Sequence, residues 1–333
     1  MGVLTRILLL VLSLVIGSGL ADKKDGNETC QDERYAKYPN HVMCLKPRSC
    51  PGKDLKVVKY KSYDMLAVLH ALNTFRSVIA SGGTAVYRPA TNMRQLTWDE
   101  ELATLAQRLA EHCDREAKLN LTVDRFAVGH IIMTSKQLRI SWGHLQPPHF
   151  MWLIKSLFVQ AFDYSYLLKD IPRWVPTPNG DYLSQLIWAE SHLVGCGYSL
   201  FMEGKTGVRM LVCLFGPKGN VVNSRVYEEG EPNCAVPSSY YEGLCTDQAA
   251  NRAFQPIPCD NSSFATKYRV LCAPKDNYLR WISTGLPYLR TPCDESFWRK
   301  MFYATVAAVL ITLLALVLGA FLIYYVKKNV FIV

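Results

Sequence analysis

The segment Glu190-Ser191-His192 combines the residue types from which hydrolases build a carboxylate, a nucleophile and a base. A nucleophile and its base must meet at hydrogen-bond distance, whereas adjacent residues of one strand or helix point apart. The sequence contains none of the GxSxG, HExxH or phosphate-binding glycine-loop patterns. The segment therefore predicts neither a peptidase nor any other enzyme.

Three further histidines have side chains suited to acid–base or ligand chemistry. His130 is a candidate lone acid or base, since imidazole titrates near neutral pH. A histidine that makes a hydrogen bond and does no chemistry is the commoner case, and we expect His130 to be one. His144 and His149 flank Pro147-Pro148, which indicates a loop, so we expect loop residues and no ligands there.

Two apolar segments lie at the ends of this chain of 333 residues. Residues 1–21 carry Arg6, an apolar run and a small-residue end at Ala21, which is typical of a signal peptide cleaved after Ala21. Residues 302–326 carry no charge and, at about 1.5 Å per residue, can cross a hydrocarbon core of about 30 Å. With residues 327–333 as a cytoplasmic tail, they predict a single-pass type I plasma-membrane protein with an extracellular ectodomain.

The apolar C-terminal segment leaves two alternatives open. A removable signal for a lipid anchor would end in an apolar tail, and here Lys327 and Lys328 interrupt it. Ala315 and Gly319 have the small-xxx-small spacing through which two spans can dimerise, although this spacing often arises by chance. We expect a membrane span, with dimerisation as an open alternative.

The residues between these ends have the composition of a folded ectodomain. The chain is 50% hydrophobic and 20% charged, which excludes a disordered protein. Its formal charge is +9, but five of the 37 basic residues lie outside the ectodomain, residues 22–298, so no nucleic-acid surface is predicted. Asn27, Asn120 and Asn261 begin N-glycosylation sequons, which we expect in exposed loops.

Eleven cysteines are spread along the chain, without the paired short-spaced CxxC sets of a zinc site. In a protein routed through the secretory pathway they predict a disulfide framework. Because eleven is odd, at least one thiol is free, lipid-modified or paired between chains, and Cys293 is the candidate. The late cysteines fall in residues 231–298, which we interpret as a cysteine-rich stalk, and their pairing stays open. They are Cys234, Cys245, Cys259, Cys272 and Cys293.

Hydrophobic periodicity predicts two amphipathic helices between residues 62 and 230. The first begins at Asp64 and its apolar stripe ends before Gly82-Gly83. The second begins at Thr97, which forms a capping-box pattern with Glu100, and its stripe places Cys113 on the core side. The apolar run 150–168 predicts a third helix. Residues 22–61 show no sustained period and predict an irregular, disulfide-held lead-in.

Residues 194–202 and 208–215 predict two strands joined in a hairpin by a glycine-bounded loop. If the turn centres near Gly204 and Lys205, Cys196 lies directly opposite Cys213, within reach of a cross-strand disulfide.

Five motifs follow one another in the order found in a known family. The sequence resembles the CAP superfamily of cysteine-rich secretory, insect venom-allergen (antigen-five-like) and plant pathogenesis-related proteins, and resembles the insect branch most. The resemblance covers roughly residues 30–245 and implies an α+β fold, the CAP-type α-β-α sandwich, with residues 62–230 as the CAP domain. The motifs span residues 73–82, 92–103, 185–188, 194–197 and 213–220, the last leading to 227–230.

The resemblance also implies a set of disulfides. In the insect branch a second cysteine follows about four residues after the position of Cys30, and another follows seven after the position of Cys113. Arg34 and Asn120 occupy those places here, so both halves of one family bridge are missing together. The pairs that remain by resemblance are Cys30 with Cys44, Cys50 with Cys113, and Cys196 with Cys213.

CAP domains commonly place two histidines and two glutamates around a central cleft, a set suited to a divalent metal. In this sequence Ala117 and Tyr182 occupy the histidine positions, and His130 and Ala161 the glutamate positions. Placing a one-residue slip earlier would put Asp181 at the position of Tyr182. Because a metal site needs three or four matched ligands, the resemblance implies no metal and no cofactor.

These features predict a non-enzymatic cell-surface protein whose ectodomain binds an unidentified extracellular partner. Lipid or sterol binding, an activity known among CAP relatives, is the alternative, with the run 150–168 and Tyr182 lining the pocket. A peptidase is the third and least favoured hypothesis. The similarity to the insect branch predicts an insect source.

Overall fold

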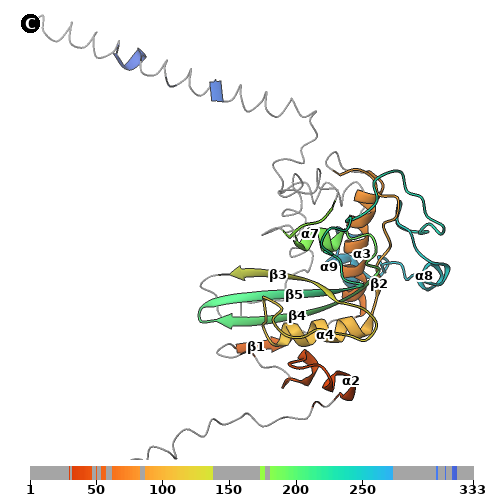
Figure 1. The fold of residues 1–333 in the computed structure, drawn as a ribbon. Coiled ribbons are helices and arrows are strands. Elements are labelled where there is room, and N and C mark those ends of the chain that lie inside the picture. The colour runs from red at the N-terminus through yellow and green to blue at the C-terminus, as the bar shows by residue number, and fades with distance from the viewer. Residues whose placement is uncertain are drawn as a thin grey trace, which may run out of the picture.

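The computed structural model describes residues 30, 32–46, 50, 54–57, 62–82, 87–137, 173–176, 181–272, 305–306, 312 and 317–320 (Figure 1). The predicted signal peptide, the run 150–168, the cytoplasmic tail, Asn27 and Cys293 lie outside them, as does most of the predicted span 302–326. Within these described residues, no helix has the length and apolar character needed to cross a membrane.

A mixed sheet of five strands forms the centre of the described fold, in the order β1-β4-β5-β3 with β2 beside β4. The strands β1, β4, β5 and β3 pair in antiparallel fashion, and β2 pairs with β4 in parallel. Their bounds are β1 Asp54–Val57, β2 Thr97–Trp98, β3 Gly129–Gln137, β4 Leu193–Glu203 and β5 Thr206–Gly216.

The central hairpin β4–β5 has the predicted register. Cys196 lies opposite Cys213, and the two form a disulfide with a Cα–Cα distance of 4.1 Å. The turn contains Gly204 at a φ of 59°, a conformation that glycine adopts without steric cost. A local pattern of strand residues around a glycine loop was thus sufficient to predict this pairing.

Helices cover both faces of the sheet (Figure 1). Helix α3 (Ser62–Ala80) packs with one set of sheet residues, including Cys196, Tyr198 and Leu200, in what we call the α3-side core. Helix α4 (Glu100–Glu111) packs with the opposite set, including Phe201, in the α4-side core. This arrangement agrees with the expected α+β sandwich.

Helix α4 begins differently from the prediction. Asp99 is its N-cap, and the Asp99 carboxylate accepts a hydrogen bond from the backbone N–H of Leu102 at 2.9 Å. The predicted capping box of Thr97 and Glu100 is therefore wrong. Thr97 belongs to β2, where its N–H donates to the carbonyl of His192 at 2.7 Å, so pairing with a distant segment sets the start of the helix.

The lead-in is part of the same folded unit. It contains the short helices α2 (Glu33–Ala36) and η1 (Val42–Cys44), whose Tyr35 and Val42 are buried in the α4-side core. Strand β1 adds an edge to the sheet beside β4. The predicted boundary between residues 61 and 62 therefore separates elements that pack together.

The described part of the predicted stalk also packs against the domain, which corrects that prediction. Its helix α9 (Ser262–Lys267) and the residue after it bury Phe264 and Tyr268 in the α3-side core. The buried Asp64 at the start of α3 accepts hydrogen bonds from Lys267 at 2.7 Å and from the Tyr268 hydroxyl at 2.5 Å. Helices as short as α8 (Gln248–Ala253) and α9 bury too few residues to show a period in the sequence.

Five disulfides hold the described residues together. Cys30–Cys44, Cys50–Cys113 and Cys196–Cys213 are the pairs implied by the family resemblance. Cys234–Cys245 and Cys259–Cys272 are the pairs that the sequence left open. Both close short loops in the segment that packs against α3.

Gly197 is a position at which one added methyl group should strongly destabilise the fold. A Cβ there would lie 2.2 Å from the backbone nitrogen of Gln107, because α4 rests directly on the sheet. We expect Gly197→Ala to destabilise the full-length chain by about 3 kcal/mol or more, or to prevent folding, since backbone cannot move aside cheaply.

The matched control is Gly204→Ala in the turn of the same hairpin. A Cβ at Gly204 meets no atom within 4 Å, so the substitution should cost only the strain of a positive φ, about 1 kcal/mol. Denaturant unfolding followed by circular dichroism measures both variants. Equal losses of unfolding free energy for the two variants would contradict the close approach of α4 to the sheet.

His70 should make the stability of the fold sensitive to acid. Its Nδ1 atom lies 2.8 Å from the hydroxyl of Tyr241. Burial lowers the pKa of His70 to about 4 from 6.5. The unfolded chain therefore binds a proton at a higher pH than the folded chain. Stability from this histidine is complete above pH 6.5 and is lost as the pH falls toward 4.

We expect His70→Asn, which does not titrate, to lessen the acid loss of unfolding free energy between pH 6.5 and 4 by about 1–3 kcal/mol. Burial also lowers the pKa values of His41 and His192, so part of the slope should remain. Urea unfolding of the two proteins at a series of pH values checks this. If the unfolding free energies of the two proteins fell in parallel as the pH is lowered, this expectation for His70 would be wrong.

Candidate functional site

The structure describes three of the four positions that the resemblance matches to metal ligands. Ala117 follows α4 at a φ of 49°, His130 is the second residue of β3, and Tyr182 lies in α7 (Asp181–Leu186). Ala161 and the side chain of the alternative ligand Asp181 lie outside the described residues. In the described part of the chain, no three His, Cys, Asp or Glu side chains are grouped to hold a metal.

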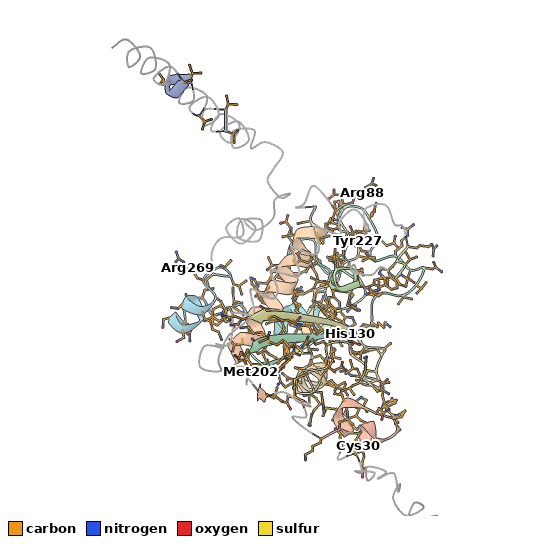
Figure 2. The ribbon with its side chains drawn as sticks, turned by 90° about the vertical axis from the view of Figure 1, so that its left-hand side faces the viewer. Cys30, Arg88, His130, Met202, Tyr227 and Arg269 are labelled. Atoms are coloured by element: carbon orange, nitrogen blue, oxygen red, sulfur yellow. A yellow bond between two sulfur atoms is a disulfide. The ribbon has the colours of Figure 1, made fainter. Side chains whose placement is uncertain are left out.

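The start of β3 and helix α7 lie in contact. Gly129 leaves the space that Gln185 occupies, because a Cβ at Gly129 would lie 2.0 Å from the Gln185 Oε1 atom. His130 and Tyr182 therefore belong to neighbouring elements, as the resemblance implied. Figure 2 shows His130 at the end of the strands opposite to Met202, with Tyr227 and Arg88 at another edge of the molecule.

The side chains of Ser191 and His192 contact different partners. The buried Ser191 hydroxyl donates to the carbonyl of Pro217 at 2.6 Å and accepts from Gln185 Nε2 at 3.2 Å. Arg94 Nη1 lies 2.7 Å from the Nδ1 atom of His192. The two side chains thus have different partners, and Ser191 joins α7 to the loop after β5.

A buried guanidinium positions the backbone around this segment. Arg76 of α3 is fully buried and donates to five backbone carbonyls at 2.6–3.3 Å. The acceptors are Arg94, Leu186, Trp188, Ala189 and Ser191. Burial lowers the pKa of Arg76 to about 9, with a contribution from the Arg94 charge, so the group stays charged at neutral pH.

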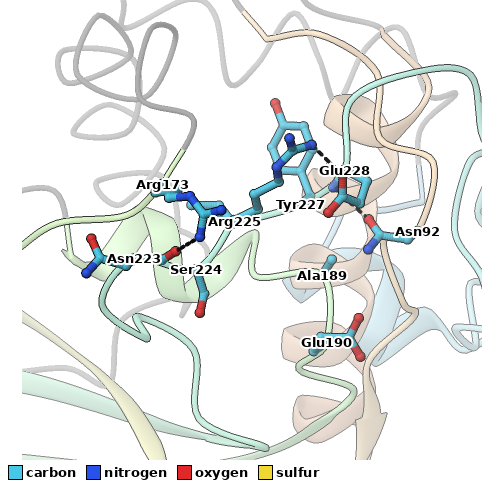
Figure 3. Close-up of a pocket in the computed structure, with 10 residues that line it drawn as sticks. Asn92, Arg173, Ala189, Glu190, Asn223, Ser224, Arg225, Tyr227 and Glu228 are labelled. Atoms are coloured by element: carbon cyan, nitrogen blue, oxygen red, sulfur yellow. Dashed lines mark hydrogen bonds and ion pairs between the residues drawn. The ribbon is translucent and has the colours of Figure 1, made fainter.

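Beside this segment lies an open polar hollow of about 350 Å³, which we call the hollow (Figure 3). On one side, residues 173–176 run beside residues 221–225, with Trp174 N–H donating to Ser224 O at 2.8 Å. On the other side lie Ala189 and Glu190. Its described lining consists of Asn92, Arg173, Ala189, Glu190, Asn223, Ser224, Arg225, Val226, Tyr227 and Glu228.

The hollow contains charges of both signs. Arg225 Nη1 pairs with Glu228 Oε2 at 2.6 Å, and the Glu228 N–H donates to Asn92 Oδ1 at 2.9 Å. Arg173 Nη1 donates to the carbonyl of Asn223 at 2.7 Å. Burial raises the pKa of Tyr227 to about 12, so this ring adds no charge at neutral pH.

Sequence reasoning did not identify the hollow. Arg173 and Asn223 lie in no periodic segment and match no chemical motif, so no local pattern marks them. Arg76 carried a usable signal, because it is a charged residue in line with the apolar stripe of its helix. Such a residue on a core face must find buried partners.

Replacing Arg76 should be among the most destabilising substitutions in the chain. Arg76→Met removes the donors and leaves five carbonyls without this partner, so we expect a loss of more than about 3 kcal/mol of unfolding free energy. Denaturant unfolding of the full-length chain measures it. Arg88→Met is the control, because Arg88 is exposed and pairs with Glu229 at 3.2 Å, and should cost less than about 1 kcal/mol. A loss below 1 kcal/mol for Arg76→Met would refute this role.

Comparison with known proteins places this architecture in a family. The model of the cysteine-rich secretory protein family, CAP, matches residues 69–215. Venom allergen 3 of Solenopsis invicta is 33% identical over 205 residues, covering 56% of this chain and 83% of that protein. The protein "CRISP/Allergen/PR-1" of Trittame loki is 30% identical over 249 residues, covering 70% of this chain.

The chain spans 59% of the length of the Trittame loki protein, so that protein's activity and partners do not transfer with the match. A crystal structure of NaASP2 with Zn2+ has a TM-score of 0.45 at 20% identity, covering 60% of this chain and 100% of that one. The assignment rests on the family model and on the sequence relatives. They show that this chain belongs to the cysteine-rich secretory protein (CAP) family.

Proposed function

We propose that this CAP-family chain is a non-enzymatic protein whose ectodomain binds an extracellular protein partner at the cell surface. One observation carries the proposal. The described positions that the resemblance matches to the metal ligands hold Ala117, His130 and Tyr182, whereas the backbone contacts between α3 and residues 186–191 are formed. A rigid framework without the side chains for chemistry suits recognition.

The energetics of the framework support this conclusion. Arg76 and Gln185 hold backbone groups and Ser191, so these contacts tie residues 185–191 to α3 and to the loop after β5. Five disulfides add to this rigidity and suit an oxidising, extracellular compartment. An interface that is ordered before binding loses less conformational entropy when a partner binds.

The location at the plasma membrane is the part of the proposal that rests on sequence alone. A signal peptide in residues 1–21 and a span in residues 302–326 would present the CAP domain outside the cell. The insect source likewise stays an expectation from sequence.

Lipid or sterol binding is the competing function. Its predicted pocket uses the run 150–168, which lies outside the described residues, and Tyr182, which packs against both cores. No contact in the described part of the chain favours it over protein recognition, so it enters as an outcome of the test.

Native mass spectrometry of the full-length chain, released from detergent after removal of glycans, separates these functions. We expect the mass of the bare chain. A persistent lipid-sized increment would replace protein recognition by lipid binding, and a zinc-sized increment would show that a metal site exists. The matching positive test is saturable binding of a purified extracellular protein to cells that display the chain and not to cells that lack it.

A further inference from the structure

The hollow beside residues 188–191 has charges that the framework does not use. We propose that it binds a dipolar loop of the partner protein, one that presents a carboxylate to Arg173 and an ammonium or guanidinium group to Glu190. This inference rests on the proposed function and names the chemistry of the partner.

Arg173 is held in place but keeps donors available. Its Nη1 atom donates to Asn223 O at 2.7 Å, and the neighbouring Trp174 is buried and exchanges backbone hydrogen bonds with Ser224 and Asn223 at 2.8 and 3.0 Å. Among the described residues, no carboxylate forms an ion pair with Arg173. The Nε and Nη2 groups can therefore bind an acidic group, and a guanidinium binds carboxylates in a two-pronged geometry.

Glu190 is fixed by its neighbours on both sides. The carbonyls of Ala189 and Ser191 accept hydrogen bonds from Arg76, and Ala189 N–H donates to Val226 O at 2.8 Å. The Glu190 side chain is exposed, and no described lysine or arginine forms an ion pair with it. A carboxylate on such a rigid segment is suited to a basic group of a partner.

The remaining charges of the hollow favour a ligand with both charges over a simple ion. Arg225 and Glu228 neutralise each other at 2.6 Å, so Arg173 and Glu190 are left as an unlike pair on opposite sides (Figure 3). Glu190 weakens the attraction of a free anion to Arg173, and Arg173 weakens the attraction of a free cation to Glu190. A ligand with both charges satisfies both residues.

The surroundings favour a protein loop over a small dipolar molecule. Val175, Val221 and Val222 are 43%, 47% and 55% exposed, and the pairing of residues 173–176 with 221–225 gathers them beside Arg173. A small molecule inside the hollow would leave these valines in water. A protein loop that enters the hollow can cover them with its flanking residues.

The test uses the full-length chain in detergent and dense arrays of end-blocked peptides. Each probe carries one Asp and one Lys separated by two to six glycines, and its controls replace Asp by Asn or Lys by Gln. We expect the dipolar peptides to give at least fivefold more binding than either control. The signal should fall as NaCl rises from about 50 to 300 mM, because salt screens exposed charges.

Charge reversal supplies the decisive comparison. Arg173→Glu and Glu190→Arg should each lower binding of the dipolar peptides at least fivefold. The double variant should restore it, because a flexible dipolar peptide can bind in the reversed direction. Arg88→Glu, which changes an exposed arginine outside the lining of the hollow, should leave binding unchanged.

Failure of the double variant to restore binding would overturn the proposal, and so would equal losses for Arg173→Glu and Arg88→Glu. Unfolding midpoints control for stability, since both target side chains are exposed. If the single variants bind the protein partner on cells as well as the unaltered chain does, the hollow is not the binding site, and the proposed function stands. A lipid-sized mass would contradict the proposed function whatever the peptides do.

Discussion

The buried guanidinium of Arg76 is the interaction on which the described architecture depends. It lies on the core face of α3 and binds carbonyls from the loop before β2, from the end of α7 and from the segment after α7. A buried charge without such partners would be too costly to keep, and carbonyls turned inward without a donor would be costly too. The guanidinium and the carbonyls therefore stabilise each other, and their hydrogen bonds fix the path of the chain between α7 and β4.

The second constraint is the close packing of α4 on the central hairpin. Gly195 and Gly197 alternate with Cys196, so the two glycines present no side chains to α4 while the disulfide lies on the α3 side. Gln107 of α4 then hydrogen-bonds the N–H and the carbonyl of Tyr198, at 2.9 and 3.2 Å. The helix thereby substitutes for a missing strand along this part of β4.

Local sequence patterns predicted the elements that short-range interactions determine. The hairpin register and the stripes of α3 and α4 follow from turn residues and periodicity. Thr97 and Asp99 are both good capping residues, and the choice between them depends on the pairing of Thr97 with β4, which no local pattern contains. The late segment likewise docks through single residues such as Tyr268, whose partner Asp64 lies 204 positions earlier. The hollow was not predictable because four segments that lie far apart in the sequence form it.

The framework contacts around residues 186–191 are made largely to backbone groups. Arg76 binds only backbone carbonyls, and Gln185 holds the backbone N–H of Gly219. Backbone groups are present whatever side chain a position carries, so substitutions along residues 186–191 that keep Ser191 need not disturb them. Exposed side chains such as Glu190 can therefore vary on a segment whose backbone contacts stay. This separation is the physical basis of the proposed recognition by surface loops.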